Sequence, residues 1–150
     1  MRGESGRSLI EIIGVMAISA VMTAGAFGIY NSVRNTQKRT IASAELEQIA
    51  KNVQILMGAR GDYNGISIEY LIKAGAMDSE HAPIGGENWS ITPSIDGMTF
   101  SINLTELSRG ECEYFSATKP RWATRIIING YETEDSCFSS DTNNISFVVE

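Results

Sequence analysis

The ionisable side chain that stands out in this sequence is Glu11, because it lies alone in a long apolar stretch. No other charged residue occurs from Leu9 to Tyr30. About 22 residues in a helix extend over roughly 33 Å, which is enough to cross the apolar core of a bilayer. A carboxylate inside such a segment costs about 2.5–3.5 kcal/mol on insertion scales, so it requires a reason. Glu11 is therefore the first candidate functional residue.

The remaining reactive side chains do not form a catalytic pattern. His81 is the only histidine, which leaves histidine-based triads and multi-histidine metal sites without their ligands, and no glycine-rich phosphate motif occurs. Cys112 and Cys137 have neither the spacing of a redox motif nor a histidine nearby, and behind a membrane signal they predict one structural disulfide. We therefore predict no enzyme and no cofactor.

Acidic residues near the second cysteine are the remaining metal-site candidates. They could line a calcium site, although a solvated loop is the favoured interpretation, and no metal is predicted. These residues are Glu132, Glu134, Asp135 and Asp141. The chain as a whole has a net charge of −6, and after Tyr30 it carries 10 of the 12 basic and 16 of the 18 acidic residues. This balance argues against a nucleic-acid surface on the C-terminal part.

Three interpretations of residues 1–30 compete. A secretory signal peptide would be cleaved at the small residues 24–26, before Phe27, but Glu11 and the length of the apolar run weigh against it. A plain signal anchor is the second interpretation, and in it Glu11 has no function. In the third interpretation Gly6-Arg7 is a processing junction, because the first six residues are short and polar and the apolar stretch starts only after them.

The junction carries a specific family resemblance. Gly6, one further residue, then Ser8-Leu9-Ile10-Glu11 and a long apolar helix resemble the class III leader of type IV pilins and pseudopilins. The resemblance implies that a prepilin peptidase cleaves after Gly6 and methylates the new N-terminal amine of Arg7, where the family usually has an apolar or aromatic residue. It also implies that Glu11 is an assembly residue, which pairs with the N-terminal amine of a neighbouring subunit.

Local helix chemistry offers a second explanation of Glu11. Ser8 and Glu11 fit a capping box, in which Ser8 caps the helix and the carboxylate of Glu11 accepts a hydrogen bond from the Ser8 backbone N–H. This role and the assembly role are compatible. Arg34, Lys38 and Arg39 follow the apolar stretch, and the positive-inside rule would draw them towards the cytoplasm. The leader and the cysteines favour a periplasmic C-terminal part instead.

Beyond the apolar stretch the pattern becomes that of an amphipathic helix. One apolar stripe falls at helical spacing: Ala42, Leu46, Ile49, Val53 and Leu56. No proline occurs from residue 7 to residue 59, so we expect one helix from about Ser8 to Met57. Its first half is apolar on every side and its second half is striped, which suits a rod that packs on its own globular head.

The C-terminal part predicts a small α+β head. We expect a short helix over 67–74, a helix over 105–117, and an antiparallel sheet of about four strands. The strands are 89–92, 98–104, the buried segment 124–129 and 145–149, with Met98, Phe100, Ile102 and Leu104 on one face of the second. The order of these elements and the cysteines resembles the head of type IVb pilins, especially those of conjugative thin pili.

These observations predict a pilin fold in four parts. They are a leader (1–6), a membrane and filament-core helix (7–30), its amphipathic continuation (31–59) and a globular head (60–150). The resemblance implies a subunit that is held as a single-pass precursor in the inner membrane, with its head in the periplasm. It also implies that pilus assembly machinery then extracts the subunit into a helical surface filament for adhesion or conjugation. Two alternatives are a pseudopilin of a type II secretion system and a signal-anchored periplasmic binding domain.

Overall fold

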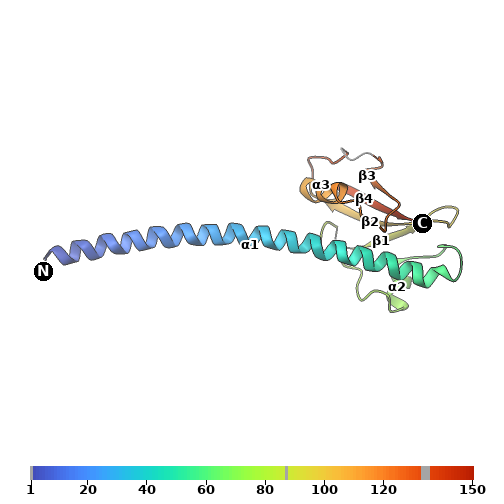
Figure 1. The fold of residues 1–150 in the computed structure, drawn as a ribbon, viewed down its shortest axis with the longest axis horizontal. Helices are drawn as coiled ribbons and strands as arrows, with labels where there is room; N and C mark the ends of the chain where they lie inside the picture. Colours follow the sequence, from blue (N-terminus) through green and yellow to red (C-terminus); the bar gives the residue numbers. More distant parts are fainter. Residues whose placement is uncertain (1, 87, 133–135) are drawn as a thin grey trace. The chain divides into compact units, whose positions relative to one another are not determined.

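The computed structural model describes residues 2–86, 88–132 and 136–150, with side chains from Ser8 onward. Contacts divide the chain into two compact units, Met1–Gln37 and Lys38–Glu150. The N-terminal helix α1, Arg2–Gly58, supplies residues to both units (Figure 1).

Helix α1 confirms the predicted long helix but begins earlier than expected. The prediction that Ser8 caps it is wrong, because α1 begins at Arg2 and Ser8 lies inside the helix. The physical reason is that no proline interrupts residues 2–58, so the backbone hydrogen bonds extend back past Ser8. The helix ends at Gly58, and Gly61 follows with a φ of +80°, a conformation that glycine adopts without steric cost.

Within the described part of the second unit, four strands form the predicted antiparallel sheet (Figure 1). The order across the sheet is β1-β2-β4-β3. The strands are β1 (Ser90–Pro93), β2 (Phe100–Leu107), β3 (Arg125–Ile128) and β4 (Asn143–Val149). The last strand in the sequence therefore lies inside the sheet, between β2 and β3.

The predicted buried strand over 124–129 is instead an edge strand. β3 pairs with β4 only, through Arg125↔Val148 to Ile128↔Ile145, and its outer edge carries no further strand of the described chain. Ile126 and Ile127 are half-buried, and only Ile128 is buried. An apolar run predicts a strand, but its place in the sheet depends on the other strands.

The N-terminal boundary of β2 differs from the prediction. Met98 was expected on the inner face with Phe100, but it lies in the turn before the strand and is exposed. The turn itself is the predicted Asp96-Gly97 hairpin signal. Its geometry is held by the carboxylate of Asp96, which accepts a hydrogen bond from the backbone N–H of Met98 (3.1 Å). That bond keeps Met98 in the turn.

The C-terminal boundary of β2 also differs. The helix expected from residue 105 begins only at Arg109 (α3, Arg109–Ala117). Ser108 is its N-cap, and the Ser108 hydroxyl accepts a hydrogen bond from the N–H of Glu111 (3.3 Å). Leu107 therefore ends β2, and a register shift after Leu104 keeps its side chain buried.

Helix α2 (Ile68–Lys73) confirms the short helix expected here. The Ser67 hydroxyl accepts a hydrogen bond from the N–H of Tyr70 (3.1 Å), as an N-cap does. Gly75 follows the helix with a φ of +75°, which ends it.

The core of the second unit combines the apolar stripe of α1 with one face of the sheet. Ala42, Leu46, Ile49 and Val53 are buried, and Leu56 is half-buried against them. The strands contribute Phe100, Ile102, Leu104, Ile145, Phe147 and Val149 to the same cluster. Burial of one such side chain contributes about 1.5–3 kcal/mol, so the stripe accounts for the helical conformation of this half of α1.

Candidate functional site

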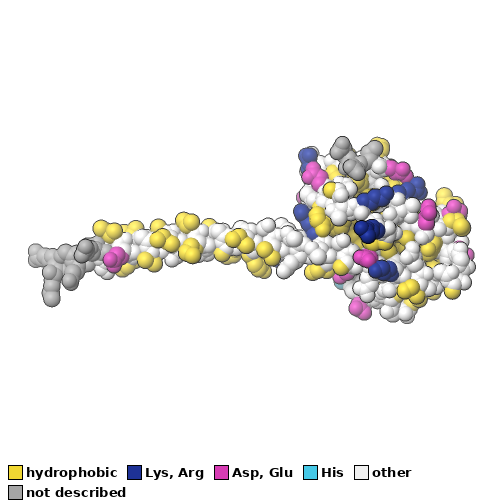
Figure 2. Space-filling model, viewed as in Figure 1, with side chains coloured by type: hydrophobic (Ala, Val, Ile, Leu, Met, Phe, Trp, Pro, Cys, Tyr) yellow, Lys and Arg dark blue, Asp and Glu magenta, His cyan; other side chains and the backbone are white. Residues whose placement is uncertain are grey.

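The first unit exposes an apolar surface that its own chain does not cover. Large apolar side chains from residue 9 to residue 33 are between 48% and 73% exposed. Figure 2 shows apolar side chains along this part of the helix on the face in view. They are Leu9, Ile10, Ile12, Ile13, Val15, Met16, Ile18, Val21, Met22, Phe27, Ile29, Tyr30 and Val33. Soluble monomers rarely expose an apolar patch of this extent, so we name residues 9–33 the apolar surface and infer that something else covers it.

Length and composition of α1 also fit a membrane span. From Ser8 onward, the helix contains a segment long and apolar enough to cross a bilayer, and none of that segment is buried. Two hydroxyls within it or beside it are satisfied by the helix itself. Thr23 donates to the carbonyl of Ser19 (2.7 Å), and Thr36 donates to that of Ser32 (3.0 Å). Such bonds let hydroxyl side chains enter an apolar medium at low cost.

Glu11 is the one carboxylate on the apolar surface. Its side chain is exposed, and no hydrogen bond or ion pair to it occurs among the described residues. Covering this surface would bury an unpaired carboxylate, which is strongly unfavourable without a cation. The cation has to come from outside the described chain. Gly6 and Arg7 belong to α1 by their backbone, and the Arg7 side chain lies outside the described part.

Three glycines within the apolar surface make no close packing contact inside the described chain. A Cβ atom at Gly14, Gly25 or Gly28 would meet nothing within 4 Å. Each glycine nevertheless weakens a helix by up to about 1 kcal/mol relative to alanine. We therefore infer that these glycines allow close contact with another molecule or allow the helix to bend or unwind.

The predicted disulfide is present in the second unit. Cys112 of α3 is bonded to Cys137, with their Cα atoms 5.9 Å apart and a sequence separation of 25. Cys112 is fully buried and Cys137 half-buried. A loop of this size contributes about 3 kcal/mol in the chain-entropy model, so the bond is suited to a structural role.

A buried asparagine, Asn143, holds the same loop, and no pattern in the sequence marks it. The Asn143 side-chain oxygen accepts hydrogen bonds from the N–H of Phe138 (2.6 Å) and from Asn129 Nδ2 (2.9 Å). Its amide nitrogen donates to the carbonyls of Leu107 (3.1 Å), Phe138 (3.0 Å) and Ser140 (2.9 Å). We name residues 136–143 the cysteine loop, and Asn143 ties it to the end of β2.

Asn129 completes this network. It lies in the Asn129-Gly130 turn with a φ of +50°, and its amide nitrogen also donates to the carbonyl of Ser136 (2.6 Å). Its side-chain oxygen accepts from the N–H of Asn144 (2.8 Å). The sequence predicted the turn at Asn129 but not this second function.

The described residues form no metal-binding site. No group of three or more potential ligands occurs among the described residues. Of the acidic residues considered for calcium, Glu132 pairs with Arg125 (3.1 Å), whereas Glu134 and Asp135 lie outside the described part. His81 lies in the loop before β1, in an isolated bridge with Asn88.

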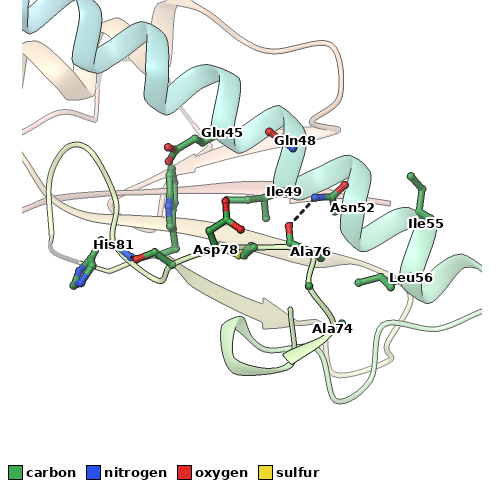
Figure 3. A pocket seen from close by; sticks show the side chains of 14 residues that line it. Glu45, Gln48, Ile49, Asn52, Ile55, Leu56, Ala74, Ala76, Asp78 and His81 are labelled. Carbon is green, nitrogen blue, oxygen red and sulfur yellow. Dashed lines mark hydrogen bonds between the residues drawn. The ribbon is translucent and has the colours of Figure 1, made fainter. Parts of the chain in front are cut away.

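A groove of about 590 Å³ lies between α1 and residues 74–81 (Figure 3). Glu45 and Asn52 line it from α1, and the Asn52 amide donates to the carbonyl of Ala76 (2.8 Å), which holds the loop beside the helix. Burial raises the pKa of Glu45, while a hydrogen bond from Trp89 opposes that rise. Asp78 lies on the loop side of the groove, and Figure 3 shows its side chain between the loop and α1.

The known proteins that this chain resembles are structural subunits. No family model matches the chain. The major structural subunit of bundle-forming pilus from Escherichia coli O127:H6 is 27% identical over 120 residues, and so is that from Escherichia coli O111:H-. Each match covers 73% of this chain and 62% of the relative, so the chain spans less than two thirds of their length.

A solved structure matches the fold. The crystal structure of TcpA, a type IV pilin from Vibrio cholerae El Tor biotype, has a TM-score of 0.64 and covers 76% of this chain and 99% of its own. The sequence identity is 12%, so this likeness concerns the fold.

Proposed function

We propose, from a type IV pilin fold and a sequence match to curated pilus subunits, that this protein is a structural subunit of a type IV pilus. The observation that carries the proposal is the apolar surface of residues 9–33 with its single unpartnered carboxylate. A membrane anchor alone would explain the apolar residues but would leave the unpartnered carboxylate of Glu11 unexplained.

The proposed mechanism is side-by-side packing of α1 from successive copies. At about 25 cal/mol for each Å² of apolar surface removed from water, burial of this surface supplies the driving force. A contact between two different faces of the same chain extends into an open helical fibre when the rotation between successive copies does not close a ring. Glu11 then lies in the fibre core and pairs with the N-terminal amine of a neighbouring copy, which offsets the cost of burying its charge.

Processing precedes assembly in this proposal. The chain is held in the inner membrane by residues 7–30 with its head in the periplasm, and a prepilin peptidase cleaves after Gly6 and methylates Arg7. Residues 31–59 continue the helix into the head, residues 60–150. Assembly machinery then extracts the subunit into a surface filament of the IVb kind, which serves adhesion or conjugation.

Cleavage is tested by N-terminal sequencing of the full chain, purified from membranes of cells that express a prepilin peptidase. We expect a start at Arg7 in the wild type and at Met1 in Gly6→Ala. Gly3→Ala is the matched control, because it makes the same change three residues earlier and should still be cleaved. A wild-type chain that starts at Met1 or at Phe27 in the presence of the peptidase would contradict the proposal.

The assembly function of Glu11 is tested with Glu11→Gln, which removes the charge and keeps the shape. We expect normal membrane insertion and loss of filaments by electron microscopy, because the amine of the neighbouring copy loses its partner. Ser8→Ala is the control, because it changes a polar side chain one helical turn before Glu11 and keeps the carboxylate, and it should assemble normally. Normal filaments from Glu11→Gln would show that the carboxylate has no part in assembly.

A further inference from the structure

The groove between α1 and residues 74–81 contains a carboxylate without a cation. Glu45 is half-buried, and no ion pair to Glu45 or to Asp78 occurs among the described residues. Apolar side chains line the same groove, Ile49 and Leu56 among them. A groove lined by both acidic groups and apolar side chains is complementary to a cation that lies next to an apolar side chain.

This chain carries such a pair on its own surface. Lys38 is exposed and forms no ion pair within the described residues, and Ile41 is 50% exposed. Because they are three residues apart on α1, both side chains lie on one side of the helix. The neighbouring cation Arg39 is already occupied, since its guanidinium lies 5.4 Å from the centre of the Tyr114 ring. Lys38 and Ile41 are therefore free to contact another molecule.

The position of Lys38 in the sequence makes a second copy of this chain the occupant of the groove. Lys38 and Ile41 follow within eight residues of Val33, where the apolar surface ends. If the apolar surfaces of two copies pack side by side, the stretch that follows on one copy lies beside α1 of the other. Glu45 and Asn52 line the groove from that helix.

We propose that Lys38 of one copy enters this groove on another copy and pairs with Glu45, while Ile41 contacts the apolar side chains that line it. Asp78 adds a second negative charge to the same groove. The inserted segment and the groove are different surfaces of one chain, so the contact is heterologous and propagates along a fibre. The inference rests on the proposed function and adds a contact between the second units of two copies to the packing of the apolar helices.

A charge exchange in the full chain tests this contact. Detergent is removed from the purified protein, and the fraction that sediments as filaments is measured and inspected by electron microscopy. Lys38→Glu and Glu45→Lys each place like charges together, so each should lower the filament fraction at least about tenfold. The double variant restores opposite charges and should return the fraction to within about twofold of the wild type.

Two further variants keep the test independent of folding. Lys119→Glu makes the same charge change at another exposed lysine and should assemble normally. Asp78 lies on the loop and is not the acceptor of the Trp89 hydrogen bond, so Asp78→Lys leaves that acceptor in place and should lower assembly as Glu45→Lys does. Circular dichroism and the unfolding midpoint establish that each variant is folded.

The outcomes separate this contact from the proposed function. Wild-type filaments together with unaffected single variants would overturn the contact alone, as would a folded double variant that fails to assemble. A wild-type chain that forms no filaments would overturn the proposed function and the contact together.

Discussion

The two parts of helix α1 differ in how far their apolar side chains are exposed. Up to Val33 its large apolar residues are exposed, whereas the apolar stripe from Ala42 to Leu56 is buried or half-buried in the core of the second unit. Both parts are regular α-helix. The difference shows that secondary structure alone does not tell which surface finds its partner within the chain. The second part is completed by the fold, and the first part requires a membrane or other copies.

The largest effect on the free energy of unfolding should come from a Leu→Ala substitution, which can be made in either part of α1. Leu46→Ala empties a buried position and should lower the free energy of unfolding of the second unit by about 2–5 kcal/mol. Leu9→Ala makes the same change at an exposed position of the same helix and should leave that free energy unchanged within about 0.5 kcal/mol. Guanidinium unfolding of the detergent-solubilised chain, monitored by tryptophan fluorescence, measures both. Equal effects would contradict the contrast between the two parts of α1.

An intermediate effect should come from the network in the cysteine loop. Asn143→Ala leaves the carbonyls of Leu107 and Ser140 without this donor, and should lower the free energy of unfolding by about 2–3 kcal/mol. Asn144→Ala is the matched control, because its side chain is exposed and its backbone N–H still donates to Asn129. Unfolding curves of the two variants measure both free energies of unfolding. An equally destabilised control would mean that the strand, and not the network, is sensitive.

The smallest effect concerns the pH dependence of the second part of α1. Because burial raises the pKa of Glu45 above 4.5, the folded chain holds this proton more tightly than the unfolded chain. The stability that Glu45 contributes is therefore present at low pH and is lost as the pH rises from 4.5 through the folded-state pKa. Glu45→Gln keeps an acceptor for Trp89 and does not titrate. The stability of the wild type relative to this variant should fall over that range in unfolding curves at a series of pH values, and a rise would contradict the sign.

Much of the local structure could be predicted, because it depends on neighbouring residues. The long helix follows from the absence of proline and from apolar periodicity, and the cap at Ser67 and the turn at Asn129-Gly130 follow from side-chain chemistry. The disulfide follows from having only two cysteines. Cleavage at Gly6 and the pairing of Glu11 stay predictions.

The predictions were wrong where the local structure depends on residues that are distant in the sequence. Leu107 fits either the start of a helix or the end of a strand, and the cap at Ser108 together with the pairing of β2 with β4 selects the strand. Ser8 would have capped a helix that began there, but the backbone continues to Arg2. Asn143 was missed because its partners come from three segments, and no local pattern marks an asparagine that is to be buried.

By itself, the sequence determined the helix, its change from an all-apolar to a striped pattern, the lone carboxylate at Glu11 and the cysteine pair. These features depend on residue type and spacing along one segment. Only the tertiary structure decided that β3 lies at the edge, that Asn143 anchors the cysteine loop, and that Glu45 lines a groove. Strand order, buried hydrogen bonds and grooves arise where segments far apart in the sequence meet, so only the folded chain contains them.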